Sequence, residues 1–183
     1  MKKSPVVTIV AIGIGAALFF VLGRFVAIPS PVPNTNISVQ YGLLAFMAGL
    51  FGPIAGLLIA FIGHALIDFS YGWGVWWSWV IASGCAGFIM GLAARKLALG
   101  RSDFDGKQIV RFNIYQIIAH LAAWVVIAPV LDILIYQEPS DKVFVQGLVA
   151  ALVNIVTTAI IGTLLALGYS KTKPKSGSLK KED

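Results

Sequence analysis

Polar and aromatic side chains gather in residues 62–80 of a sequence that is otherwise strongly apolar. His64 and Asp68 are four residues apart, which places both on one face of a helix, where they could ligate a metal or relay a proton. Two ligands are too few to define a metal site. A polar pair that faces a water-filled cavity or another helix is the simpler interpretation.

Four of the five tryptophans lie in the same stretch, at positions 73, 76, 77 and 79. Indole rings favour membrane interfaces, so an aromatic belt is one interpretation of this cluster. Trp76, Trp77 and Trp79 cannot all face lipid, however, because helical neighbours are about 100° apart. At least one indole is predicted to point inward beside Asp68, where it would line an outward-facing pocket for a planar, partly polar ligand.

Ionisable residues inside apolar runs are costly, so each one is a candidate for function. Arg24 and Asp132 fall at a depth similar to that of Asp68, near the predicted outer ends of their helices. Arg24 could contact a ligand, or it could pair with one of the two aspartates and extend to the interface. His120 and Asn154 lie nearer the middle of their helices, and interhelical hydrogen bonds are the expected role for both.

The sequence lacks the motifs of several common enzyme classes. It contains no phosphate-binding lysine loop, no HExxH, no GxSxG and no His/Cys spacing typical of a metal site. Its single cysteine, Cys85, excludes an internal disulfide. These features predict a protein that is not an enzyme and that needs no cofactor or metal of its own.

The elements that must position these residues are membrane helices. The chain has 183 residues, of which 58% are hydrophobic and 12% charged, and its mean hydropathy is +0.86. Runs of about 20 apolar residues, enough to cross the bilayer, fill most of it. We expect an all-α polytopic protein with one membrane domain, residues 1–170, and a disordered basic cytoplasmic tail, residues 171–183. The six predicted helices lie near residues 5–28, 37–51, 53–69, 75–94, 111–135 and 143–169.

Two helix boundaries depend on proline. The first helix is predicted to end before Pro29, which starts a proline-rich loop. Residues 37–67 carry no charge, and one helix of that length would measure about 47 Å, more than one bilayer. Gly52 and Pro53 therefore divide this run into a short second helix and a third helix. The first helix is long enough to span the membrane, so we expect it to be retained and not cleaved as a secretory signal.

Basic residues predict the orientation. In the six-helix arrangement, all but Arg24 and Lys142 of the fourteen lysines and arginines fall on one side. Short cytoplasmic loops collect basic residues, so both termini are predicted to be cytoplasmic. Anionic lipid headgroups account for the net charge of +6 without a nucleic-acid partner.

The order of several short motifs resembles a known family. AIGIGAAL in the first helix, FGPIAGLLIAFIGHALIDF in the middle and GFIMGLAARK at the end of the fourth helix resemble the substrate-binding S components of energy-coupling factor (ECF) transporters. The resemblance covers essentially the whole chain. It is closest to a branch of that superfamily known only as uncharacterised membrane proteins.

This resemblance implies a high-affinity binding subunit for a vitamin or similar micronutrient in the bacterial plasma membrane. It would work with a transmembrane coupling subunit and two cytoplasmic ATPases. The ligand would lie near the outer face under the loop PSPVPNTNIS, which makes Asn34 and Asn36 candidate contacts. The small-residue motif of the first helix contacts the coupling subunit in the family, which points to Ala11 and Gly15.

Two other functions stay open at this point. A self-sufficient proton-coupled carrier could use a relay of ionisable side chains, namely His64, Asp68, His120 and Asp132. A membrane enzyme could use His64 and His120, although no nucleophile lies beside a base in the sequence. For a binding subunit, the predicted contacts are Trp76, Trp77, Trp79, Asp68, Arg24, Asn34, Asn36 and Asp132. Such a site suits a heteroaromatic vitamin or precursor, for example a pyrimidine, a flavin or a thiamine-like compound.

Overall fold

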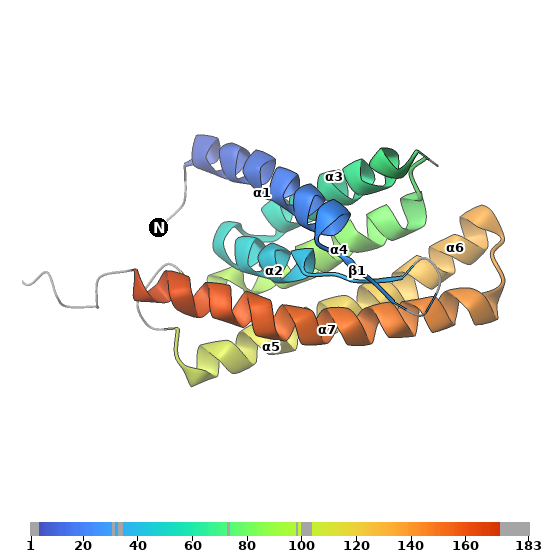
Figure 1. Ribbon diagram of the computed structural model, residues 1–183. Helices are drawn as coiled ribbons and strands as arrows, with labels where there is room; N and C mark the ends of the chain where they lie inside the picture. Colours follow the sequence, from blue (N-terminus) through green and yellow to red (C-terminus); the bar gives the residue numbers. More distant parts are fainter. Residues whose placement is uncertain are drawn as a thin grey trace, which may run out of the picture.

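The chain forms a bundle of apolar helices (Figure 1). The computed structural model describes residues 4–30, 32, 35–72, 74–97, 99 and 104–172. Its helices are α1 (Pro5–Phe25), α2 (Gln40–Phe51), α3 (Pro53–Tyr71), α4 (Trp77–Leu92), α5 (Gly106–His120), α6 (Ala128–Tyr136) and α7 (Ser140–Lys171). A 3-10 turn, η1 (Ala93–Arg95), follows α4, and a π-helical segment, η2 (Leu121–Ile127), joins α5 to α6 in one continuous rod.

The helices differ in their ability to cross a membrane. Four segments are long and apolar enough, namely α1, α3, the rod of α5 to α6 (Gly106–Tyr136) and α7. The apolar helices α2 and α4 are shorter, and the 12 residues of α2 reach only about 18 Å. The structure therefore has the predicted helical membrane architecture, while six crossings remain a prediction. Figure 1 shows the start of α1 and the end of α7 at the same end of the bundle.

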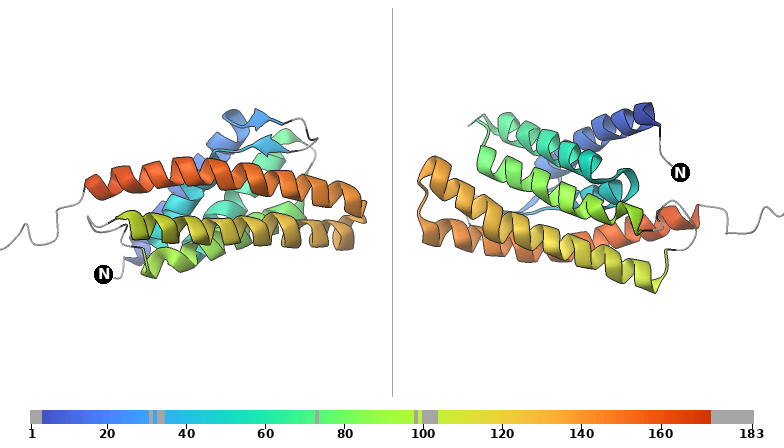
Figure 2. Two further views of the ribbon diagram at one scale, coloured as in Figure 1. Left: turned by 90° about the horizontal axis from the view of Figure 1, so that it is seen from below. Right: turned by 180° about the vertical axis from the view of Figure 1, so that it is seen from behind.

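A short β-ribbon replaces the expected helix ends on either side of the first loop. β1 (Ile28–Pro29) pairs antiparallel with β2 (Asn36–Ile37), with Ile28 opposite Ile37. Consequently α1 ends at Phe25 and not near residue 28, and α2 begins at Gln40 and not near residue 37. The prolines prevent a helix from continuing, but no pattern in the sequence predicts the strand pairing. The ribbon runs beside the bundle in Figure 2.

The other helix ends lie close to those expected, with extensions at the polar loops. α5 begins at Gly106, five residues before the predicted start, because the side chain of Asp105 caps it by accepting a hydrogen bond from the Gln108 amide at 3.0 Å. α7 begins at Ser140, whose N-terminal neighbour is Pro139, and it continues to Lys171. The predicted disordered tail lies outside the described residues from position 173 onward.

Glycines let the helices approach closely where α3 crosses α4. A Cβ atom added to Gly87 would overlap the backbone carbonyl of Gly56, and the reverse is also true. α1 packs on α3 in a related way, because a Cβ added to Gly15 would lie 2.7 Å from the side chain of Ile59. Small residues thus bring α1, α3 and α4 together, as is common among membrane helices.

Replacing Gly87 with leucine is expected to destabilise the protein by about 3 kcal/mol, because α3 and α4 would have to separate to accommodate the side chain. The same change at Gly13, where a Cβ would meet nothing within 4 Å, is expected to alter stability by less than about 0.5 kcal/mol. Thermal unfolding of both variants in detergent measures the difference. Equal stability of the two variants would contradict the close crossing.

Candidate functional site

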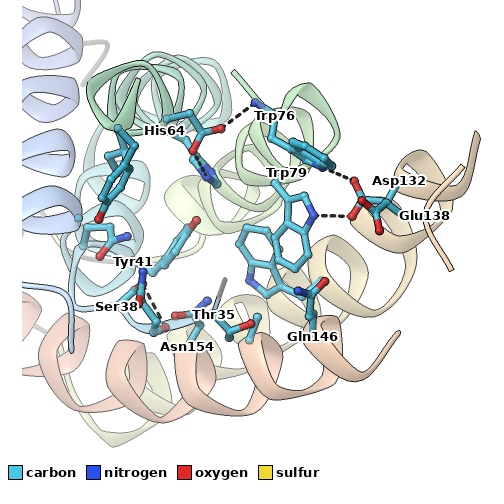
Figure 3. A pocket seen from close by; sticks show the side chains of 18 of the residues that line it. Thr35, Ser38, Tyr41, His64, Trp76, Trp79, Asp132, Glu138, Gln146 and Asn154 are labelled. Atoms are coloured by element: carbon cyan, nitrogen blue, oxygen red, sulfur yellow. Dashed lines mark hydrogen bonds and ion pairs between the residues drawn. The ribbon is translucent and has the colours of Figure 1, made fainter. Parts of the chain in front are cut away.

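A cavity of about 560 Å³, seen from close by in Figure 3, lies toward the end of the bundle that is opposite the start of α1 and the end of α7 (Figure 1). Its walls come from the C-terminal half of α3, the start of α4, η2, α6 and the first half of α7. α2 contributes Gln40 and Tyr41, and the segment around β2 contributes Thr35, Asn36 and Ser38. This volume falls within the range of pockets that enclose small organic ligands.

Asp132 holds the start of α4 against α6. Its carboxylate accepts hydrogen bonds from the indole nitrogens of Trp76 and Trp79, at 2.7 and 2.6 Å, and from the hydroxyl of Ser78. The residue is 2% exposed. Asp132 was predicted to contact the ligand directly, and it does line the cavity. Its two oxygens are nevertheless engaged by three donors of the protein itself, so in this structure it orients the indole rings.

The rings that Asp132 orients form an aromatic wall. Trp79 stacks on Trp124 with ring centroids 5.4 Å apart, and Trp76 stacks on Tyr136 at 4.3 Å. Tyr41 meets Trp124 edge to face at 5.4 Å. Stacked and edge-to-face pairs of this kind stabilise each other beyond simple burial. The wall is therefore a rigid surface against which a flat ligand can lie.

Hydrogen bonds from behind fix Trp124 in place. Its indole nitrogen donates to Nδ1 of His120 at 2.9 Å, and Nε2 of the same histidine pairs with the hydroxyl of Thr158 at 3.0 Å. His120 is fully buried, and its expected interhelical hydrogen bond is thus present. Trp124 itself was missed from the sequence, because an isolated tryptophan in an apolar run carries no local sign of its partners.

A second group of polar side chains crosses the cavity floor from α2 to α3. The hydroxyl of Ser83 pairs with Tyr41 at 2.8 Å and with Nδ1 of His64 at 2.5 Å. Nε2 of His64 lies 3.6 Å from Asp68, whose other oxygen accepts from the backbone amide of Trp76 at 2.9 Å. Asp68 therefore contacts the backbone of Trp76, a residue that also lines the cavity. His64 belongs to the same group, and both residues line the cavity.

Two of the predicted ligand contacts do not reach the cavity. The guanidinium of Arg24 lies over the ring of Tyr71, 4.2 Å from its centroid, and pairs with neither aspartate. Trp77 is 46% exposed, packs beside Phe61 and is not among the lining residues. Their positions therefore give no support to either as a ligand contact, whereas Trp76 and Trp79 at the start of α4 both line the cavity.

The loop asparagines have different outcomes. Asn36, a predicted ligand contact, lines the cavity. Asn34 lies outside the described residues. On α7, Gln146, Ala150 and Asn154 line the cavity at intervals of four residues, which places them on one helix face. Gln146 and Asn154 are eight residues apart in an otherwise apolar helix, and this spacing in the sequence could have predicted a polar face.

Two buried carbonyl oxygens in the cavity wall lack a hydrogen-bond partner within the described part of the chain. They are Oε1 of Gln40, which is 5% exposed, and Oδ1 of Asn154, which is 4% exposed. The expected interhelical hydrogen bond of Asn154 is therefore not made by this oxygen. Buried acceptors are usually satisfied, so each of these atoms lacks a donor that would offset its loss of water.

Together, the apolar helical bundle and the aromatic, polar cavity at one end are typical of a membrane-embedded protein with a site for a small molecule. A family model described as "ECF-type riboflavin transporter, S component" matches residues 3–171. The chain belongs to this family. The resemblance predicted from the sequence is confirmed.

Relatives with high identity extend over the whole chain. They include a UPF0397 protein of Enterococcus faecalis, 52% identical over 181 residues that cover 99% of each chain. The UPF0397 protein YdcD of Lactococcus lactis subsp. lactis is 51% identical over 183 residues, all of both chains. A UPF0397 protein of Staphylococcus aureus is 51% identical over 184 residues, again covering 100% of both chains.

A solved structure shares the fold. The crystal structure of the S component for biotin from an ECF-type ABC transporter matches with a TM-score of 0.56 and 17% identity, covering 87% of this chain and 91% of that one. The family is a substrate-binding component of membrane transporters and not a class of enzymes. The protein is accordingly a multi-pass membrane transport protein whose task is recognition.

Proposed function

We propose that this protein is the high-affinity substrate-binding subunit of an ECF-type importer for a vitamin or vitamin precursor. The observation that carries the proposal is the aromatic wall, in which Asp132 fixes the indole nitrogens of Trp76 and Trp79 so that their ring faces border the cavity. A preorganised wall of this kind binds a flat ring tightly, because little side-chain freedom is lost on binding. A heteroaromatic compound such as a pyrimidine, a flavin or a thiamine-like molecule meets this requirement.

Energy for transport would come from partner proteins. The sequence contains no phosphate-binding lysine loop, so we assign ATP hydrolysis to two cytoplasmic ATPases acting through a transmembrane coupling subunit. Ligand binding would stabilise one conformation of the subunit, and the partners would drive the other. Six membrane crossings in a single domain, with both termini cytoplasmic in the plasma membrane, complete this arrangement. The start of α1 and the end of α7 lie at the same end of the bundle, which supports placing both termini on one side of the membrane.

We place the docking surface on a different face of α1 from the one expected. Ala11 and Gly15, the predicted docking residues, are both buried, and Gly15 packs against Ile59 of α3. The second pair of small residues four apart, Gly13 and Ala17, lies on the exposed face of the same helix. We therefore place the contact with the coupling subunit on the Gly13–Ala17 face, where a partner helix could approach closely.

The test of the proposed function is ligand retention. The protein, purified in detergent from cells grown on complex medium, is expected to carry a stoichiometric small heteroaromatic molecule that mass spectrometry identifies after denaturation. The purified chain alone in liposomes is expected to take up none of this ligand when a pH gradient is applied. Uptake driven by the gradient would instead support the carrier that uses His64, Asp68, His120 and Asp132, and retention of no small molecule would contradict a high-affinity binding subunit.

A further inference from the structure

The charge of the cavity excludes one kind of ligand. Its described lining includes the carboxyl groups of Asp68, Asp132 and Glu138, with Lys142 as the lining lysine. The ammonium of Lys142 is 2.6 Å from the carboxylate of Glu138, so that pair is self-contained. Arg24 is directed to the ring of Tyr71. An anionic ligand would therefore enter a cavity that has more carboxylates than cations and in which the described cations are already engaged, which costs free energy.

The unpaired polar atoms of the cavity are acceptors. The oxygens Oε1 of Gln40 and Oδ1 of Asn154 are buried without a partner in the described structure, and each requires a donor to offset its loss of water. Figure 3 shows Asn154 at the opposite side of the cavity from His64 and Trp76. A ligand that spans this distance would meet an amide oxygen at one edge and the carboxylate region of Asp68 at the other.

The walls between these two edges suit the same chemistry. Trp79 and Trp124 present π-electron faces, and such faces attract positively charged or electron-poor rings. The acceptor atoms, the excess of carboxylates and the indole wall thus favour the same type of ligand. None of these three features favours a carboxylate or a phosphate.

We infer that the substrate is a neutral or cationic nitrogen heterocycle that donates N–H or amino hydrogens to Asn154 and Gln40 and carries no carboxylate or phosphate group. This inference rests on the proposed function and narrows it, since it separates the substrate from acidic vitamins. It predicts a selectivity unlike that for biotin, which is an acid and is the ligand named for the structural relative.

A defined mixture of compounds tests the inference. The purified protein in nanodiscs is incubated with equal concentrations of biotin, nicotinic acid, pantothenic acid, thiamine phosphate, nicotinamide, pyridoxamine, thiamine and riboflavin. Bound compounds are then quantified by mass spectrometry after rapid gel filtration. We expect the retained compound to come from the last four. Preferential retention of any of the first four overturns the inference and leaves the proposed function intact, whereas retention of none counts against both.

Substitutions at Asn154 test the acceptor role. With the retained compound as the titrant, Asn154→Leu is expected to lower affinity about tenfold or more, because the donor of the ligand loses its partner. Asn154→Asp keeps an acceptor at the same position and is expected to hold affinity within about threefold of the original or to raise it. A loss in Asn154→Asp as large as in Asn154→Leu would overturn the inference.

Gln116 provides the matched control. Its Oε1 is also buried without a partner in the described structure, and the side chain is 1% exposed, but the residue does not line the cavity. Gln116→Leu is therefore expected to leave affinity unchanged. If Gln116→Leu and Asn154→Leu weaken binding equally, the effect is a general disturbance of the bundle and the inference fails.

Discussion

Replacing Trp79 with alanine is expected to weaken ligand binding about a hundredfold. The indole of Trp79 lines the cavity and stacks on Trp124, so its removal takes away a central part of the flat surface that the ligand would contact. Truncation of an aromatic residue at the centre of a binding site commonly costs about 2–4 kcal/mol. Isothermal titration with the ligand identified by mass spectrometry measures the change.

Trp77 is the matched control for this substitution. It is two residues away, also an indole and 46% exposed, but it faces away from the cavity. Trp77→Ala is expected to change affinity by less than about threefold, because only surface contacts are lost. If Trp77→Ala weakens binding as much as Trp79→Ala, the site does not lie where the structure indicates.

Replacing Asp132 with alanine is expected to destabilise the protein by about 3–5 kcal/mol. The substitution leaves the indole nitrogens of Trp76 and Trp79 and the hydroxyl of Ser78 without their acceptor. Each unpaired donor costs about 1–3 kcal/mol where water cannot replace the acceptor. Thermal unfolding in detergent measures the loss, and tryptophan fluorescence reports whether the indole rings become disordered.

Asp105→Ala is the control that shows how much stability is lost when an aspartate with a single hydrogen bond is removed. The carboxylate of Asp105 accepts a single hydrogen bond from the Gln108 amide at an exposed helix start. Asp105→Ala is expected to cost about 1 kcal/mol. Should Asp132→Ala prove no more destabilising than Asp105→Ala, Asp132 would not connect the two helices in the way described.

The parts of the site that could be predicted are those that local spacing determines. Asp68 lies in the last turn of α3, and the tryptophans follow the short loop after that helix. They therefore lie at a similar depth in the membrane, because the helix ends at Gly72 and the chain turns back there. The argument that three indoles cannot share one direction also holds, since Trp77 points away from the cavity while Trp79 lines it. Local sequence thus predicted one of the stretches that line the cavity.

The partners of these residues could not be predicted, because they are distant in sequence. Asp132 is more than fifty residues in sequence from Trp76 and Trp79, which donate hydrogen bonds to it. Nothing near Asp132 in the sequence shows whether its carboxylate binds a ligand or accepts hydrogen bonds from the protein itself. The same holds for Trp124 and Gln40. On α1, apolar residues surround the helix, so the sequence could not show which of its two small-residue pairs faces α3.

The number of residues in the π-helical segment η2 determines the direction in which Asp132 points. Gln116, His120, Trp124, Ala128 and Asp132 are all buried and follow one another at steps of four. In a regular α-helix such steps drift by about 40° each, so Asp132 would turn some 120° away from His120. The wider turn of η2 cancels this drift. An insertion or deletion of one residue within 121–127 would therefore rotate the aspartate away from its indoles.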